Sequence, residues 1–225
     1  MEALDKAIKS NNLKYVMGHV NKPELAPVVV ETALHYGNYN VAYTVATKWK
    51  KTILTDAVKD ENMTVISYLI NHGFVDEYIA AYTAAEYNQK DVINYLLKNH
   101  YKHDLYDSIF LGGIEGENPF MIRFANENDK DLNFGYGMLL AIDNNKFYSL
   151  DYLLQICNPG KDIFEIATIF RNPRAVQILL ENGLIPTKKD LEKALSMYNE
   201  AEEDDIKIRK EIVDIFKDYG LIKMN

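Results

Sequence analysis

The residue types that most often bind metals or attack substrates are sparse in this sequence and are not gathered into a recognisable site. Histidine occurs at five positions, His19, His35, His72, His100 and His103. His100 and His103 are close together, but no second pair of ligands accompanies them, as a zinc site would require. Cys157 is the single cysteine and follows a pair of leucines on an apolar face, so we expect it to pack as a small core residue. These residues predict neither a metal site nor a Cys–His nucleophile pair.

Glycine-rich segments and paired carboxylates also give no sign of phosphate binding or acid–base catalysis. The segment Gly112–Gly116 (GGIEG) lacks the G-x-G-x-x-G order and a preceding strand, and the segment 133–137 has no basic partner. Asp56 and Asp60 lie one helical turn apart, which is a common spacing on solvated helix faces. The sequence therefore predicts no catalytic residue, no cofactor and no metal, and we expect a protein that is not an enzyme.

The composition is that of a globular protein with an excess of acids. The 225 residues are 48% apolar and 26% charged, and 33 acids against 25 bases give a formal charge of −8. Such a charge would repel a phosphate backbone, so we expect no nucleic-acid partner. A single cysteine allows no intramolecular disulfide, as is usual in a reducing compartment. The N-terminus lacks the apolar core of a signal peptide, and no apolar run approaches the ~20 residues that span a bilayer. We expect a cytoplasmic protein with no membrane partner.

An internal repeat is the strongest signal in the chain. Counting from Ala57, apolar residues lie 8, 9, 12 and 13 positions later, and Gly73 lies 16 positions later. Counting from Ala167 gives the same apolar positions, with Gly183 at position 16. The frame fits elsewhere with an alanine or glycine marker at residues 7, 33, 57, 84, 112, 141, 167 and 194. The markers are 24 to 29 residues apart, which predicts a repeat of about 27 residues over nearly the whole chain.

Each copy predicts a pair of short helices. The first helix ends about three residues after the marker, and Gly, Asn or Asp then supplies a turn. The second helix buries its four apolar positions, which share one face at the helical period. One pair cannot bury its apolar face alone, but stacked neighbours can bury it together.

The pattern A-x-x-x-G-x-x-x-φ-φ-x-x-L-L-x-x-G, where φ is apolar, resembles the helical part of the ankyrin repeat. The best matches are Ala57–Gly73, Ala167–Gly183 and Ala33–Val45. The resemblance implies an all-α solenoid of about eight stacked helix-turn-helix repeats that binds other proteins. No copy carries the T-P-L-H motif, and the period is shorter than the ~33 residues of the family, so we expect its projecting β-hairpin to be trimmed or missing. Divergent proteins of this kind are common among viruses with AT-rich genomes, and the excess of lysine over arginine is compatible with such a source.

We expect one ankyrin-like repeat domain over residues 1–225, with three irregular places. The copy near 112–135 has a glycine marker and a proline, and it is either a bent joint or the product of drift. The last copy, 187–225, needs about nine extra residues to place its apolar positions, and we expect it to cap the array. Its acidic run, 199–205, is a solvated cap or an acidic docking patch. The segment 23–27 (PELAP) is expected to link the first and second copies.

The first helices are expected to line a concave binding face. Residues one position before and three positions after each marker share the exposed side of these helices. At the later position we expect outward-facing aromatics with acids between them, and we assign partner binding to Tyr36, Asp60, Tyr87, Glu115 and Phe170. The alternative is that the rings pack onto the next helix.

Three functions follow from these patterns. The first is a non-enzymatic protein–protein interaction module that binds a host or cellular protein through the concave helical face, as a viral host-interaction or defence-antagonist factor. The second is an acidic mimic of nucleic acid. The third is a self-assembling structural protein, which would form a homo-oligomer.

Overall fold

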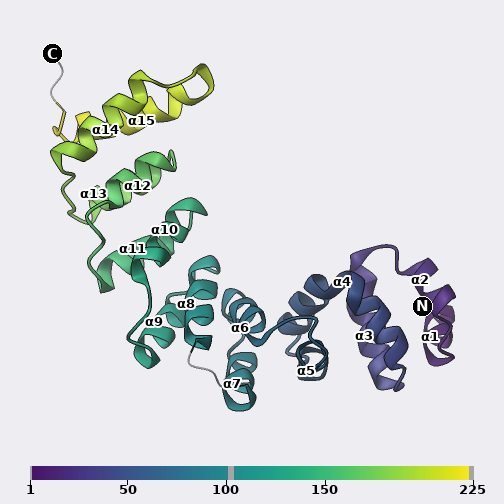
Figure 1. Ribbon diagram of the computed structural model, residues 1–225. Helices are drawn as coiled ribbons and strands as arrows, with labels where there is room; N and C mark the ends of the chain where they lie inside the picture. Colours follow the sequence, from purple (N-terminus) through teal and green to yellow (C-terminus); the bar gives the residue numbers. More distant parts are fainter. Residues whose placement is uncertain (1, 101–103, 223–225) are drawn as a thin grey trace. The chain divides into compact units, whose positions relative to one another are not determined.

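The structure is a computed structural model that describes residues 2–100 and 104–222 (Figure 1). Within these ranges the regular secondary structure is entirely helical, with no β-strand, so the all-α prediction is confirmed. The helices up to the gap are α1 (Glu2–Lys9), α2 (Leu13–His19), the 3₁₀ helix η1 (Pro23–Leu25), α3 (Ala26–His35), α4 (Tyr39–Lys59), α5 (Met63–Asn71), α6 (Glu77–Glu86) and α7 (Lys90–Asn99). Those after it are α8 (Leu105–Glu115), α9 (Pro119–Asn128), α10 (Phe134–Asp143), α11 (Phe147–Ile156), α12 (Ile163–Ile169), α13 (Pro173–Glu181), α14 (Lys188–Asn199) and α15 (Glu203–Asp218).

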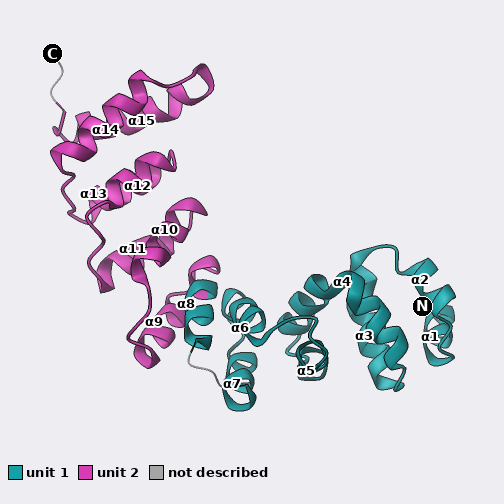
Figure 2. Cartoon of the chain, in the orientation of Figure 1, with its two compact units in different colours: residues 1–112 teal, residues 113–225 magenta. Residues whose placement is uncertain are grey.

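The chain divides into two compact units, residues 1–112 and 113–225 (Figure 2). Helices α1 to α7 belong to the first unit and α9 to α15 to the second, and the division falls inside α8. The single domain expected over residues 1–225 stays a prediction.

The second unit contains two rows of helices. Helices α10, α12 and α14 contact one another in series, and α11, α13 and α15 form the facing row (Figure 1). Each helix of the first row is joined by a turn to its partner in the second, and the apolar core lies between the rows. Its fully buried side chains include Leu150, Leu153, Val176, Leu179 and Phe216.

The first unit has the same kind of pairing, but α4 belongs to two pairs. Helix α4 packs against α3 and α5 and has non-helical dihedral angles at Trp49 (φ −124°, ψ 20°). Before this kink it buries Val41 and Val45 as the second helix of one pair, and after it the chain forms the first helix of the next pair. No loop therefore separates these two pairs, whose markers, 24 residues apart, are the most closely spaced in the chain.

The segment 23–27 is also more helical than the expected linker. Residues Pro23–Leu25 form the 3₁₀ helix, and Ala26 and Pro27 begin α3. A proline is accommodated there because the first helical turn lacks hydrogen-bond partners for its amides.

One kind of turn joins the two helices of most pairs. Within the described ranges, seven of the turns that join the first helix of a pair to the second place one residue in the left-handed region, with φ between 50° and 71°: Asn11, Gly37, Glu61, Asn88, Glu117, Asn145 and Arg171. The next amide donates a hydrogen bond of 2.7–3.0 Å to the carbonyl five residues earlier, on Ala7, Ala33, Ala57, Ala84, Gly113, Ala141 and Ala167. This bond closes the first helix by the Schellman arrangement. Six of the seven acceptors are marker alanines of the sequence analysis.

The fifth marker is Gly113 and not Gly112, so the expected frame of that copy was one residue early. Helix α9 accordingly buries Met121, Ile122 and Ala125, whereas Phe120, which we expected in the core, is 40% exposed. Both glycines allow close packing: a Cβ on Gly112 would collide with the Tyr82 carbonyl oxygen, and one on Gly113 would lie 3.0 Å from the Ile122 nitrogen. Two adjacent glycines made the register ambiguous in the sequence.

The last pair, α14 and α15, has a different turn. No left-handed residue joins these helices, and the acidic run continues into the first turn of α15. Helix α15 buries Ile212, Val213 and Phe216, the residues that the extended last copy was expected to bury.

Side-chain amides at the start of the second helices tie neighbouring pairs together. Asn38 Nδ2 donates to the Ile8 carbonyl at 2.7 Å, and Gln89 Nε2 donates to the Lys59 carbonyl at 2.8 Å. In the second unit, Asn172 is 6% exposed and its Nδ2 donates to the Ile142 carbonyl at 2.7 Å. The Ile142 carbonyl is buried and needs a partner, since an unsatisfied buried carbonyl costs about 1–3 kcal/mol.

The left-handed turns predict that Glu61→Gly stabilises the protein. Glu61 has φ 54° and is exposed, so its side chain contributes little that offsets the strain. Glycine adopts this conformation without the steric cost of a Cβ, and we expect the free energy of unfolding to rise by about 0.5–1 kcal/mol in urea denaturation. Glu61→Ala keeps the Cβ and is the matched control; an equal gain in both variants would contradict this explanation.

The amide bridges predict an unusually large cost for Asn172→Ala. The Asn172 Oδ1 accepts from the Ala175 amide at 3.0 Å and caps α13, while Nδ2 bridges to the previous pair. Losing both functions should lower the free energy of unfolding by about 2–3 kcal/mol. The control is Asn62→Ala. Asn62 also caps its helix, α5, but its amide donates to the exposed side chain of Glu31 and not to a backbone carbonyl. We expect this substitution to lower the free energy of unfolding by about 1 kcal/mol. Equal losses would show that the bridge to Ile142 contributes nothing.

Candidate protein-interaction surface

Four of the five predicted partner-binding residues lie directly after the first helix of a pair. Tyr36, Asp60, Tyr87 and Phe170 are the C-terminal caps of α3, α4, α6 and α12. The three rings are 37–38% exposed and Asp60 is exposed, so all four reach the surface. Glu115 is instead the last residue of α8 and is half-buried; the register correction places it one position earlier in the frame than expected.

In the first unit, the two predicted tyrosines are each covered on one side by a lysine of the preceding pair. The Lys9 Nζ lies 5.4 Å from the centre of the Tyr36 ring, and the Lys59 Nζ lies 4.5 Å from that of Tyr87. Both lysines occupy the position two residues after a marker alanine. Such contacts are attractive because the ring face carries partial negative charge. The two rings are therefore covered on one side by the preceding pair and partly exposed on the other.

Tyr36 makes a further contact with Asp5. Its hydroxyl lies 3.3 Å from both carboxylate oxygens of Asp5, as donor to the carboxylate. The negative charge of Asp5 raises the pKa of the Tyr36 hydroxyl, with smaller contributions from burial and from the hydrogen bond itself. Tyr36 thus remains a neutral donor, held between helices α1 and α3.

In the second unit, the two predicted residues, Glu115 and Phe170, have different surroundings. Glu115 accepts from Asn144 Nδ2 at 2.9 Å and pairs with the Lys146 ammonium at 2.9 Å, so its carboxylate is largely satisfied within the protein. Phe170 lies beside Ile169, which is 48% exposed. Glu115 is therefore a weaker candidate for partner binding than Phe170.

The structure also exposes apolar residues that we did not predict. Val28, Ile79 and Tyr136 are 43%, 49% and 50% exposed, and each lies five positions before a marker alanine. The residues five before, one before and three after the marker are spaced by four, so they form one stripe along the first helix. We call this stripe the first-helix face. Extending the predicted spacing by one turn toward the N-terminus would have found these residues.

The residues tested for chemistry are dispersed. Among the described residues, no three His, Cys, Asp or Glu side chains lie together as a metal site would require. His103 lies outside the described residues. His19 and His72 each use Nδ1 to bond the carbonyl four residues earlier in their own helix, at 2.8 and 2.9 Å. These two imidazoles therefore have structural contacts at helix ends.

Cys157 is half-buried at the C-terminal end of α11, and is not the core residue that we expected. Its thiol donates to the Leu153 carbonyl at 3.2 Å. Burial raises the pKa of the thiol. The thiolate, which is the reactive form, is therefore disfavoured.

Comparison with known proteins found no match: no family model, no curated protein and no solved structure is significantly similar to this chain. None of the described helices combines the length and apolar character needed to cross a bilayer.

The environment of Cys157 predicts slow alkylation in the folded protein. Because burial raises its pKa, a smaller fraction of the thiol is ionised at pH 8 than in the unfolded chain, and the thiolate is the form that reacts. We expect iodoacetamide to react several-fold more slowly with native protein than with protein in urea, and the native rate to keep rising above pH 8.5. The urea sample is the control, and equal rates in both would contradict a protected thiol.

Proposed function

We propose that this chain is a non-enzymatic protein-interaction module, built as an ankyrin-like solenoid of helical pairs, that binds a host or cellular protein through its first-helix face. The recurring turn supports the solenoid, because it closes successive first helices at the same place in the frame. Within each unit, stacked pairs of this kind expose a row of first helices to a partner.

The exposed apolar and aromatic side chains of the first-helix face carry the proposal. Val28, Ile79 and Tyr136 are 43–50% exposed on first helices whose opposite side is buried, and Phe170, directly after α12, is 38% exposed. Aromatic and aliphatic side chains of this kind anchor interfaces, whereas a surface with only solubilising functions would favour charged ones. The excess of lysine over arginine agrees with an AT-rich viral source, and a viral factor that acts on a host protein in the cytoplasm is the form of the proposal that we favour.

Ion pairing favours a protein partner over the alternative of a nucleic-acid mimic. In the second unit, Glu165 pairs with Lys189 at 3.0 Å, and Asp205 pairs with Arg171 at 2.7 Å. Acids that are already paired leave fewer free charges in rows, which a mimic of a phosphate backbone would need.

Alanine substitutions of the exposed rings test the proposal. The partner is first identified by affinity capture from candidate host cells, and its Kd is then measured with purified protein. Tyr36→Ala, Tyr87→Ala or Phe170→Ala should each weaken binding about 30-fold if the ring is a hot spot worth about 2 kcal/mol.

The matched control is Tyr148→Ala. Tyr148 is 76% exposed but lies on α11, a second helix, and so lies outside the first-helix face. Its loss should leave the Kd unchanged. Unchanged binding by all three first-helix variants, with native circular dichroism, would reject this face as the binding surface.

A further inference from the structure

A pocket opens in the second unit where helices α12 and α14 begin. Its volume is about 460 Å³, and it lies between the loop before α12 and the loop before α14. The walls are mainly apolar, formed by Pro159, Ile163, Phe164, Leu184 and Ile185. Ile185 is 81% exposed at the rim, although such a side chain is normally covered. The pocket is therefore a place where a partner could bury apolar surface.

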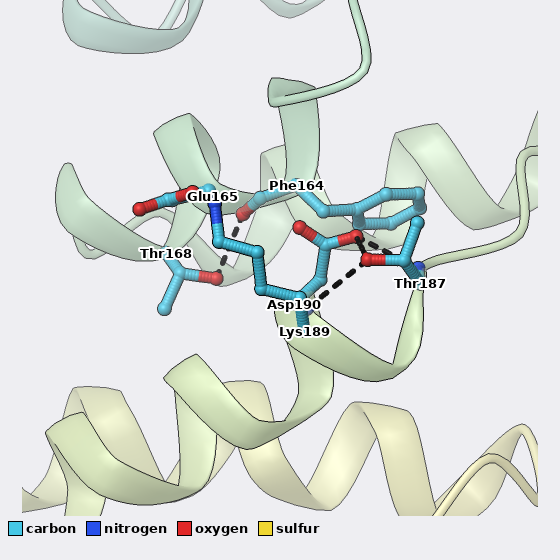
Figure 3. Close-up of polar contacts among 6 residues, drawn as sticks. All are labelled: Phe164, Glu165, Thr168, Thr187, Lys189 and Asp190. Atoms are coloured by element: carbon cyan, nitrogen blue, oxygen red, sulfur yellow. Dashed lines mark hydrogen bonds and ion pairs between the residues drawn. The ribbon is translucent and has the colours of Figure 1, made fainter.

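A nearly buried carboxylate also lines this pocket. Asp190 is 4% exposed, and its Oδ2 accepts from the amide and the hydroxyl of Thr187, both at 2.7 Å (Figure 3). This capping box starts α14 and uses one carboxylate oxygen. The other oxygen, Oδ1, accepts no hydrogen bond from any described residue. Oδ1 is not among the buried polar atoms that lack a partner, so it reaches solvent and is open to a donor that enters the pocket.

The charges around the pocket are negative in sum. Lys189 Nζ bonds Glu165 Oε2 at 3.0 Å across the two helices (Figure 3). This hydrogen bond and the charge of Glu165 raise the pKa of Lys189, and the charges of Asp162 and Asp190 raise it further. Lys161 is the other cation at the pocket. Asp190 and Lys161 line the pocket, and Glu165, Asp162 and Lys189 lie beside it, so the neighbourhood carries one excess negative charge, which favours a cationic ligand.

We propose that this pocket binds a lysine or arginine side chain presented by the partner protein. The apolar stem of the residue lies against Phe164 and Ile185, and its cationic head donates to Asp190 Oδ1. A neutral apolar side chain would leave Oδ1 without a donor, and an acidic one would be repelled by the carboxylates. This assignment rests on the proposed function and specifies the chemistry of the partner at one end of α12 and α14.

The test uses n-butylguanidinium chloride, which mimics an arginine side chain, with the full-length protein. Binding is followed by NMR through the methyl signals of Ile163 and Ile185, and a probe this small should bind with a Kd on the order of 10 mM. 1-Pentanol, which is neutral and of similar length, should bind at least about tenfold more weakly. Added salt should weaken the binding of the guanidinium and leave that of the alcohol unaffected.

Two substitutions are expected to change the Kd of the guanidinium in opposite directions. Asp190→Asn keeps an oxygen for Thr187 but removes the charge, and should raise the Kd of the guanidinium about tenfold or more. Lys189→Met removes a competing cation that is 74% exposed, and should lower the Kd two- to fivefold. Because Lys189 is largely exposed, this variant is expected to fold even if Asp190→Asn does not. Equal binding of the alcohol and the guanidinium, no saturable shift, or weaker binding to Lys189→Met would each overturn the proposal.

A second copy of the chain is the competing occupant, since Ile185 could insert into the pocket of another molecule. Sedimentation equilibrium separates the two cases. A monomer supports a heterologous ligand, whereas a dimer that Ile185→Lys abolishes would overturn the proposal. These measurements need no partner protein, so their failure would leave the first-helix face to be judged by the ring substitutions alone.

Discussion

The hydrogen bond that closes each first helix is the constraint on which the rest of the structure depends. A backbone amide at the start of the second helix donates to a marker carbonyl, and this reversal is possible because the residue between them is left-handed. The bond fixes where the chain turns, and so it fixes which residues of the second helix face the core. It also places the side chain at the start of that helix within reach of the preceding pair, as the bridge from Asn172 to Ile142 shows. A local turn thus controls both the core and the contacts between neighbouring pairs.

The sequence predicted which residues are buried wherever the repeat allowed only one register for the helices. The marker alanines and the apolar positions that follow them predicted buried residues such as Val65, Leu69, Val176 and Leu179 because helical periodicity leaves few alternatives. It was ambiguous at Gly112 and Gly113, where two adjacent residues satisfied the same requirement. It also gave no sign that α4 would continue through Trp49, since a helix that belongs to two pairs has the same apolar spacing as two helices joined by a loop.

The candidate surface was predicted less completely than the core. Tyr36, Tyr87 and Phe170 reach the surface at the expected position. The lysines that cover the two tyrosines were not predicted, because each belongs to a different copy of the frame from its ring. Contacts between copies depend on how the pairs stack, and periodicity within one copy carries no information about this. The unused oxygen of Asp190 is a similar case, since its environment is formed by two loops that are distant from each other in the sequence.

The helix shared by two pairs has a consequence for cooperativity. In an array whose members are joined by loops, one member can unravel while its neighbour stays folded, because only the interface between them is lost. Helix α4 is shared by two pairs, so neither can unfold without breaking the same helix of 21 residues, which runs through Trp49. The stretch from α3 to α5 therefore behaves as a single foldon, and the lone tryptophan sits at its centre as a native fluorescent reporter of that event.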